Sequence, residues 1–305
     1  MRGGRSLIAV LIAVPALTAL AGCGSESSFD ASGGDATRGR EVFALAGGCS
    51  CHTPEKGPVG AGGKPLETPF GTFYPTNITS DRERGIGAWT DAEIEGAIRR
   101  GVLRDGSVES PVMPYYRYAG MSDADVRDLI AYLRSLTPSP QENQPYEVSL
   151  PFPRLAFRGW RLLFAKDVTP PATSPASGVE RGRYLSNHVA ICDDCHTPRS
   201  RFGVSEDDLY LAGVEHGPLG EVVPNITSDK QTGIGGWGPG DIENVLEMGM
   251  LPDFDNVQGL MAEVVDGIGG GIGYAQASKV DREAIAEYIH GVPPIVNRIK
   301  GQKAE

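Results

Sequence analysis

Two short clusters of cysteine and histidine are the residues of this chain best suited to do chemistry. The first covers residues 49–52 (CSCH) and the second covers residues 192–196 (CDDCH), and a Thr-Pro pair follows each. The second is a complete C-x-x-C-H motif, in which two thiols bond to the vinyl groups of a haem and the histidine binds the iron. The sequence therefore predicts covalent haem attachment at Cys192 and Cys195, with His196 as an axial ligand.

The first cluster is one residue shorter between its cysteines. Cys51 directly precedes His52, as in the usual motif, but Gly48 stands where the first cysteine normally lies and Cys49 is shifted by one position. Either Cys49 still reaches a vinyl group, or Cys51 alone bonds to the porphyrin. Zinc or a redox dithiol is a third interpretation, although these three donors leave a tetrahedral zinc site incomplete. We predict a haem here as well, because the sequence that follows is repeated.

An internal repeat covers most of the chain. The segment 77–81 (NITSD) recurs at 225–229, and 85–89 (GIGAW) recurs as GIGGW at 233–237, both at an offset of 148 residues. The histidines of the two clusters are 144 residues apart, so the second copy has four additional residues in between. Because the order of the segments is kept, we interpret the repeat as the duplication of one domain.

The repeated segments also predict a local structure. Asn77 and Asn225 each begin an Asn-Ile-Thr triplet, which suggests a loop held by asparagine side-chain hydrogen bonds. Trp89 and Trp237 close the second repeated segment, and we expect them either beside a haem or as ordinary core residues.

Helical patterns surround each cluster. The predicted helices cover residues 37–46, 90–100 and 122–136 in copy one and 179–186, 239–248 and 279–290 in copy two. Thr90 and Glu93 form a capping box at the start of one of them, and Ser122 begins another. No segment shows a convincing alternation of the kind typical of strands. We therefore expect a mainly α fold.

Composition agrees with a folded, water-soluble body. Of 305 residues, 40% are hydrophobic and 22% are charged, as in globular proteins. The 41 glycines, 23 prolines and 7% aromatic residues indicate many loops and small cores, which suits a fold completed by a large apolar cofactor. The net charge of −11 argues against nucleic acid as a partner and permits docking to a basic redox partner.

The first 22 residues have the features of a bacterial lipoprotein signal peptide. Arg2 and Arg5 precede an apolar run of about 15 residues, which is shorter than the roughly 20 that a spanning helix needs. The sequence LAGC, ending at Cys23, resembles a lipobox, so we expect Cys23 to be lipidated and residues 23–34 to be a flexible tether. A cleaved soluble protein and an uncleaved anchor are the alternatives.

The same assignment accounts for all five cysteines. Cys23 takes the lipid and the other four lie in the two clusters, which leaves none for a structural disulfide. Because bacteria attach haem covalently outside the cytoplasmic membrane, we expect the protein on the periplasmic side of a bacterial membrane.

In combination, these residues resemble the dihaem c-type cytochromes, and most closely the cytochrome c subunits of bacterial membrane-bound alcohol and aldehyde dehydrogenases. The likeness rests on the two clusters, on the repeated NIT and GIGxW segments, and on the RGRYL sequence at 181–185 that leads into the second cluster. Those subunits often carry three haems, whereas this chain has two clusters. The resemblance implies two tandem class I cytochrome c-like domains, which we place at residues 35–137 and 178–294. The segment between them, 138–177, is rich in proline at both ends and has an apolar middle at 154–164 that favours a short helix, so we expect an ordered interdomain strap there and a tail at 295–305.

The resemblance also implies a methionine as the second axial ligand of each iron, in a loop before the last helix of each domain. Met113 and Met261 occupy such positions, again 148 residues apart. A thioether favours reduced iron and raises the potential. The alternative is that these methionines are flexible core fillers. The competing histidines, none of which recurs in the other copy, are His188, His216 and His290.

The predicted function is electron transfer by two covalently bound haems. The protein would carry electrons from a periplasmic dehydrogenase to a terminal oxidase or another cytochrome of the respiratory chain. A dihaem redox enzyme of the peroxidase or thiosulfate-oxidising type is the alternative, but such an enzyme needs a displaceable position at the iron, and a methionine in both copies argues against it. A metal-binding or structural module is a third class.

Overall fold

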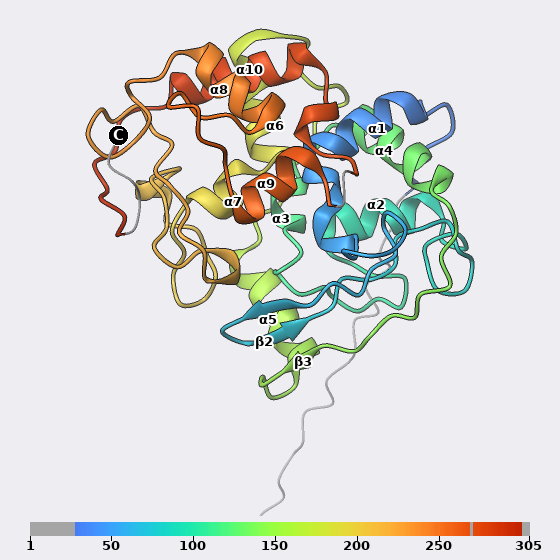
Figure 1. Cartoon of the computed structure of the whole chain (residues 1–305). Coiled ribbons are helices and arrows are strands. Elements are labelled where there is room, and N and C mark those ends of the chain that lie inside the picture. The colour runs from blue at the N-terminus through green and yellow to red at the C-terminus, as the bar shows by residue number, and fades with distance from the viewer. Residues whose placement is uncertain (1–27, 269–270, 301–305) are drawn as a thin grey trace, which may run out of the picture.

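The structure is a computed structural model that describes residues 28–268 and 271–300. It is mainly helical (Figure 1), which confirms the predicted fold class, and each predicted helix forms within two residues of its expected ends. The α-helices are α1 (Ala36–Leu45), α2 (Asp91–Arg100), α3 (Tyr115–Tyr118), α4 (Asp123–Ser135), α5 (Pro153–Phe164), α6 (Gly178–His188), α7 (Cys192–His196), α8 (Pro239–Met248), α9 (Gly259–Asp266) and α10 (Lys279–His290). The 3-10 turns are η1 (Gly47–His52), η2 (Asp207–Leu209), η3 (Pro218–Gly220) and η4 (Tyr274–Gln276).

The predicted lipoprotein signal peptide and Cys23 lie outside the described residues, and so does the end of the predicted C-terminal tail. Within residues 28–268 and 271–300, no helix has both the length and the apolar character needed to cross a bilayer. The anchor at Cys23 therefore stays a prediction of the sequence.

Each copy is built around one pair of crossing helices, α1 with α4 and α6 with α10 (Figure 1). A glycine at each crossing lets the two backbones approach closely. A Cβ atom on Gly39 would lie 1.9 Å from the carbonyl oxygen of Asp128, and one on Gly182 would lie 1.8 Å from that of Ala284. Both glycines stand in an Arg-Gly-Arg sequence, so the two crossings are equivalent points of the repeat.

The predicted helix starts have the expected caps, with one addition. Thr90 Oγ1 accepts from the Glu93 N–H at 3.2 Å and the Glu93 carboxylate accepts from the Thr90 N–H at 2.7 Å, which confirms the capping box. Ser122 Oγ accepts from the Asp125 N–H at 3.1 Å. The Asp125 carboxylate accepts from the Tyr184 hydroxyl at 2.6 Å. This bond joins α4 of copy one to α6 of copy two.

One hydrophobic cluster runs through both copies. Phe43 and Ile130 from copy one and Leu185 and Ile285 from copy two belong to it, and each is at most 2% exposed. Burial of apolar surface is the main source of folding free energy. The copies therefore share one core, although each has its own pair of crossing helices.

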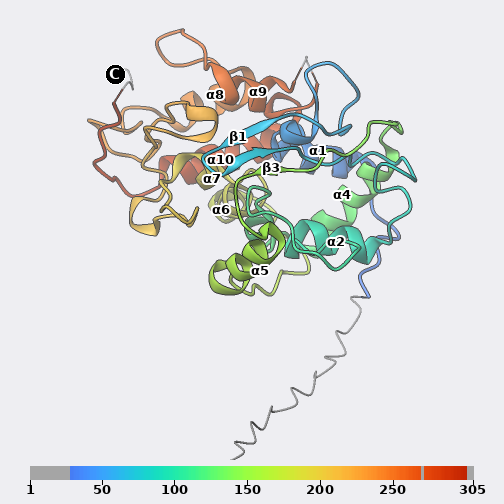
Figure 2. The same cartoon turned by 90° about the horizontal axis from the view of Figure 1, so that it is seen from below.

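A small antiparallel sheet lies beside copy one and was not predicted from the sequence. Its strands are β1 (Leu66–Thr68), β2 (Gly71–Phe73) and β3 (Glu147–Val148), with β2 in the middle. Strands of two or three residues are too short to show an alternating pattern. In Figure 1 the sheet lies near α5 at the bottom of the molecule, and Figure 2 views this region from below.

Helix α5 contacts both copies. The Trp160 indole N–H donates to the Phe202 carbonyl of copy two at 2.7 Å, and Arg161 Nε donates to the Arg100 carbonyl of copy one at 2.9 Å. Helix α5, which lies in the segment between the copies, thus bridges the two. Exposed apolar side chains on the outer side of α5 are Leu155, Leu162 and Leu163.

Candidate functional site

The two clusters hold their histidines in equivalent settings. His52 Nδ1 lies 2.7 Å from the Thr76 carbonyl oxygen, and His196 Nδ1 lies 2.9 Å from that of Pro224. When Nδ1 carries the proton and donates to the carbonyl, Nε2 is left as the free acceptor, which is the form in which imidazole binds a metal. Burial lowers the pKa of both histidines and so favours this neutral form.

The loops that carry these two carbonyls are held by asparagine, as predicted. Asn77 Oδ1 accepts from the Thr79 N–H at 2.9 Å and from the Thr79 hydroxyl at 2.7 Å. Asn225 Oδ1 accepts from the same two groups of Thr227 at the same distances. Each asparagine is at most 2% exposed and directly follows the carbonyl that orients a histidine. The repeated triplet therefore positions the iron ligand indirectly.

An Asn225→Ala variant is expected to lose about 2–4 kcal/mol of unfolding free energy, because a buried amide that pairs with Thr227 and with the Ile295 carbonyl at 2.8 Å disappears. Urea unfolding followed by circular dichroism measures the loss. Asn256→Ala is the matched control, since the Asn256 side chain is exposed and its removal is expected to cost less than about 0.5 kcal/mol. Equal stability of the two variants would contradict this role.

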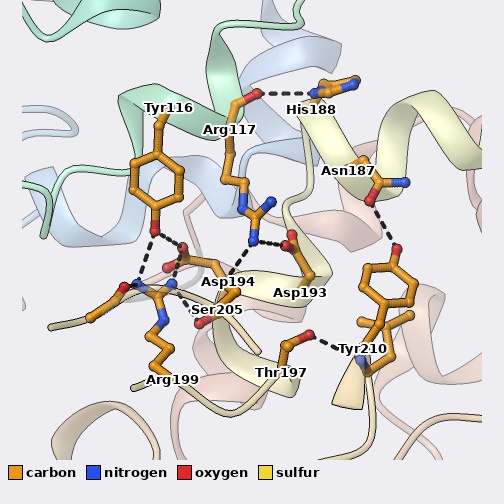
Figure 3. A network of polar contacts seen from close by, with 12 residues as sticks. Tyr116, Arg117, Asn187, His188, Asp193, Asp194, Thr197, Arg199, Ser205 and Tyr210 are labelled. Atoms are coloured by element: carbon orange, nitrogen blue, oxygen red, sulfur yellow. Dashed lines mark hydrogen bonds and ion pairs between the residues drawn. The ribbon is translucent and has the colours of Figure 1, made fainter. Parts of the chain in front are cut away.

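A polar network joins copy one to the second cluster (Figure 3). Arg117 pairs with Asp193, and Arg199 pairs with Asp194. The Tyr116 hydroxyl donates to Asp194 Oδ1 at 3.1 Å and accepts from Arg199 Nη1 at 2.9 Å. Burial raises the pKa of Asp193 to about 6, and the Arg117 guanidinium opposes this rise. The two residues between the cysteines of the second cluster thus attach it to α3, which begins two residues after Met113.

Copy two contacts the first cluster in return. Helix α9 packs against η1, and a Cβ atom on Gly47 would meet the Val264 side chain of α9 at 3.5 Å. Close by, Lys64 Nζ pairs with the Glu263 carboxylate at 2.6 Å. Farther along copy two, the Ile272 carbonyl faces Gly48. The segment after the candidate methionine of each copy therefore lies against the cluster of the other copy.

The four cysteines of the two clusters are free thiols. Burial raises the pKa of Cys49, Cys192 and Cys195 to about 12, so these thiols stay protonated at neutral pH. Within the described part of the chain, no group of three or more His, Cys, Asp or Glu residues is arranged to hold a metal ion.

The two candidate methionines lie in different local structures. Met113 stands in a turn before α3 and is half-buried. Met261 lies in α9 and packs against the shared core, so the loop expected around it is a helix. The sequence from Leu260 to Val265 consists mostly of apolar and helix-favouring residues, which explains the difference. The role of either methionine as a ligand stays a prediction.

The three competing histidines lie outside the two clusters. His216 and His290 are exposed. His188 ends α6, where its Nδ1 lies 3.0 Å from the Arg117 carbonyl oxygen, so it is part of the contact between the copies.

Comparison with known proteins agrees with this geometry. The sequence model of the cytochrome c family matches residues 36–137. A protein of Cereibacter sphaeroides described as "Diheme cytochrome c-type" is 38% identical over 269 residues, which cover 86% of this chain and 87% of that protein. The chain belongs to the diheme c-type cytochromes. The resemblance deduced from the sequence is thereby confirmed.

Other relatives of this diheme cytochrome are subunits of dehydrogenases. The cytochrome c subunit of alcohol dehydrogenase (quinone) from Gluconobacter oxydans is 34% identical over 85% of this chain and 55% of that protein. The gluconate 2-dehydrogenase cytochrome c subunit of Pantoea cypripedii is 36% identical over 74% of this chain and 54% of that protein. The chain spans about half the length of these two subunits.

The residues present fit the haem of a c-type cytochrome. Each cluster offers an imidazole whose Nε2 is free, because Nδ1 is engaged, and two thiols beside it. Sequence reasoning missed the orienting carbonyls of Thr76 and Pro224. A signal for them existed, since both directly precede the repeated asparagine at the same offset of 148 residues.

Proposed function

We propose that this diheme cytochrome is an electron carrier with one covalently bound haem at each cluster, anchored through Cys23 to the periplasmic side of a bacterial membrane. It takes electrons from a periplasmic dehydrogenase and passes them to the respiratory chain. The observation that carries the proposal is the pair of equivalent histidines, each with Nδ1 on a backbone carbonyl and each directly after a cysteine of its cluster.

The chain's own residues do three things in this function. Bound haem supplies a reversible one-electron couple at iron. His52 and His196 hold a fixed ring orientation because their Nδ1 atoms are engaged. The shared core and the network around Arg117 and Asp194 keep the two clusters in one fixed arrangement, which favours transfer between them without a domain movement.

The proposed partners follow from the relatives and from charge. Several relatives are named as cytochrome subunits of alcohol, gluconate and fructose dehydrogenases, so we propose a dehydrogenase of this general kind as the donor. The net charge of −11 suits docking to basic surfaces of redox partners, and opposite charge raises encounter rates.

Spectra and respiration together test the carrier function. The purified protein should contain two low-spin haems and should not turn over hydrogen peroxide. High-spin iron that consumes peroxide would favour the enzyme alternative. Membranes of the source bacterium should reduce haem c and take up oxygen when given an alcohol, gluconate or fructose, and deletion of this gene should abolish uptake with at least one of them. Unchanged uptake with all substrates that the wild type oxidises would argue against a dehydrogenase as the donor.

A Cys23→Ser variant is expected to move from the membrane fraction to the soluble periplasmic fraction, because it loses the acylated residue. Immunoblots of the two fractions measure the change. A Ser25→Ala variant is the control and should stay with the membrane. If Cys23→Ser also stays there after a high-salt wash, another part of the chain provides the attachment.

A Met113→Ala variant is expected to lower the midpoint potential of one haem by on the order of 100 mV and to reduce the methionine-to-iron absorption, because a soft thioether that favours reduced iron is removed. Spectroelectrochemical titration measures both potentials. Met121→Leu is the control, because Met121 is a buried core residue and the exchange keeps its volume. If the two potentials of Met113→Ala were the same as those of Met121→Leu, Met113 would not be an axial ligand.

A further inference from the structure

The shortened first cluster differs from the second only before its histidine. After the histidine the copies agree: the His52 carbonyl accepts from the Gly62 N–H at 2.7 Å, and the His196 carbonyl accepts from the Gly213 N–H at 2.7 Å. The histidine side chains are also held alike. The backbone therefore has to compensate for the missing residue between residue 47 and Cys51.

A left-handed turn compensates for the missing residue. Gly47, Gly48 and Cys49 have φ values of 65°, 61° and 45°. Such values are common for glycine and unusual for cysteine. Directly before the second cluster, one residue has this conformation, Ile191 with φ 46° and ψ 47°, and Cys192 follows it. At Cys49 the angles are nearly the same, φ 45° and ψ 46°. The sharp turn is thus placed on the cysteine itself in copy one.

A cysteine could not stand at position 48 in this fold. A Cβ atom on Gly48 would lie 1.5 Å from the carbonyl oxygen of Ile272, far inside van der Waals contact. The segment of copy two that packs on the first cluster therefore occupies the space of a side chain at the usual first-cysteine position. The next residue, Cys49, is the nearest position at which a thiol fits.

The turn after it is wound more tightly than in copy two. The Thr53 N–H donates to the carbonyl three residues earlier, at Ser50, whereas the Thr197 N–H donates to the carbonyl four residues earlier, at Asp193. A 3-10 turn rises about 2.0 Å per residue and an α-turn about 1.5 Å. Cys49 itself is left-handed and stands before this turn, so the tighter winding applies after it. The steeper rise per residue there makes up in part for the residue that is missing between the two cysteines.

The surroundings of the thiols also correspond. Cys49 and Cys192 both pack against the shared hydrophobic core. The repeated sequence Tyr-Ala-x-x-Ser makes Tyr118 and Tyr274 equivalent residues. Tyr274 belongs to that core and Tyr118 packs against it.

We infer that Cys49 takes the place of Cys192 in copy one, so that the shortened C-x-C-H cluster attaches its haem through two thioether bonds, at Cys49 and at Cys51. This inference rests on the proposed haem at the first cluster. In each attachment the S–H adds across a vinyl C=C bond: sulfur bonds to one vinyl carbon and the hydrogen goes to the other. Nothing leaves and no net oxidation occurs.

The test counts free thiols, because the addition leaves the total mass equal to protein plus haem whether one or two bonds form. The full chain, matured with haem, is unfolded in guanidinium, treated with iodoacetamide and digested, and the peptide containing residues 49–52 is analysed by mass spectrometry. We expect haem on this peptide and no alkylated cysteine in it, as in the peptide containing residues 192–196, which is the internal reference. Haem together with one alkylated cysteine would overturn the inference.

The pyridine haemochrome spectrum provides a second, independent test. In a Cys49→Ala variant, the pyridine haemochrome α-band is expected to broaden towards longer wavelength, since one of four vinyl groups is now unreacted, while both haems stay covalently bound. A Ser50→Ala variant is the control and should keep the wild-type band. An unmoved band in Cys49→Ala would show that Cys49 never bonded to haem. If the peptide containing residues 49–52 carries no haem while the peptide containing residues 192–196 does, both this inference and the proposed two-haem function fail. A single thioether bond at Cys51 overturns the inference alone.

Discussion

A Cys192→Ala, Cys195→Ala double variant is expected to contain one covalent haem per chain, half the wild-type content. The imidazole of His196 and its carbonyl partner stay in place in this variant, but no thiol remains in copy two to bond to a vinyl group. Haem that survives acidified acetone extraction, measured per chain by the pyridine haemochrome assay and by intact mass, gives the number directly. The result tests whether each cluster carries its own haem.

The reciprocal Cys49→Ala, Cys51→Ala variant is the matched partner of this experiment. It should also contain one covalent haem, now attached to the intact motif of copy two. Far-ultraviolet circular dichroism shows whether each variant keeps its helices. A folded double variant that still contains two covalent haems, or a reciprocal variant that keeps two, would contradict the assignment of one haem to each cluster.

The second large effect is expected for Gly182→Ala. The added methyl carbon would lie 1.8 Å from the Ala284 carbonyl oxygen, so α6 and α10 have to move apart. Overpacking of well-packed elements costs typically about 1–3 kcal/mol and sometimes more, and backbone atoms at this crossing cannot rotate away. We expect a loss of at least about 3 kcal/mol, together with a lower yield of haem at the second cluster, because α6 leads directly into it.

Gly240→Ala separates this steric effect from any general effect of the substitution. Gly240 lies in the first turn of α8 in the same copy, is exposed, and has no atom within 4 Å of an added Cβ. Alanine favours helix over glycine by roughly 1 kcal/mol, so this variant is expected to be equal to or more stable than the wild type in urea unfolding. If Gly182→Ala were as stable as Gly240→Ala, the close crossing of α6 and α10 would not be a feature of the folded protein.

Much of the fold could be predicted because its signals are local. The helices at 90–100 and 122–136 begin at residues whose side chains cap them, and Thr90 and Ser122 do so in the structure. The asparagine loops could be predicted because the triplet forms its own hydrogen bonds within two residues. The cysteine and histidine clusters were visible from residue type and spacing alone.

The remainder depends on contacts between distant segments. The sheet joins β2 to β3, whose residues are more than 70 positions apart, and no local pattern marks strands of this length. The helix around Met261 was missed because the resemblance implied a loop at both methionines, whereas only Met113 stands in a turn and Met261 lies in α9. The Arg117–Asp193 pair joins the two copies, and a single sequence does not show which charges will meet.

The continuous core has a thermodynamic consequence. Side chains such as Phe43 and Leu185 belong to one buried cluster. Unfolding of either half would therefore expose apolar surface of the other half to water. The chain is therefore expected to melt in a single cooperative transition. Contacts that a haem makes only in the native form would add their free energy to that whole transition, so on the proposed function a haem in one half is expected to stabilise the opposite half as well.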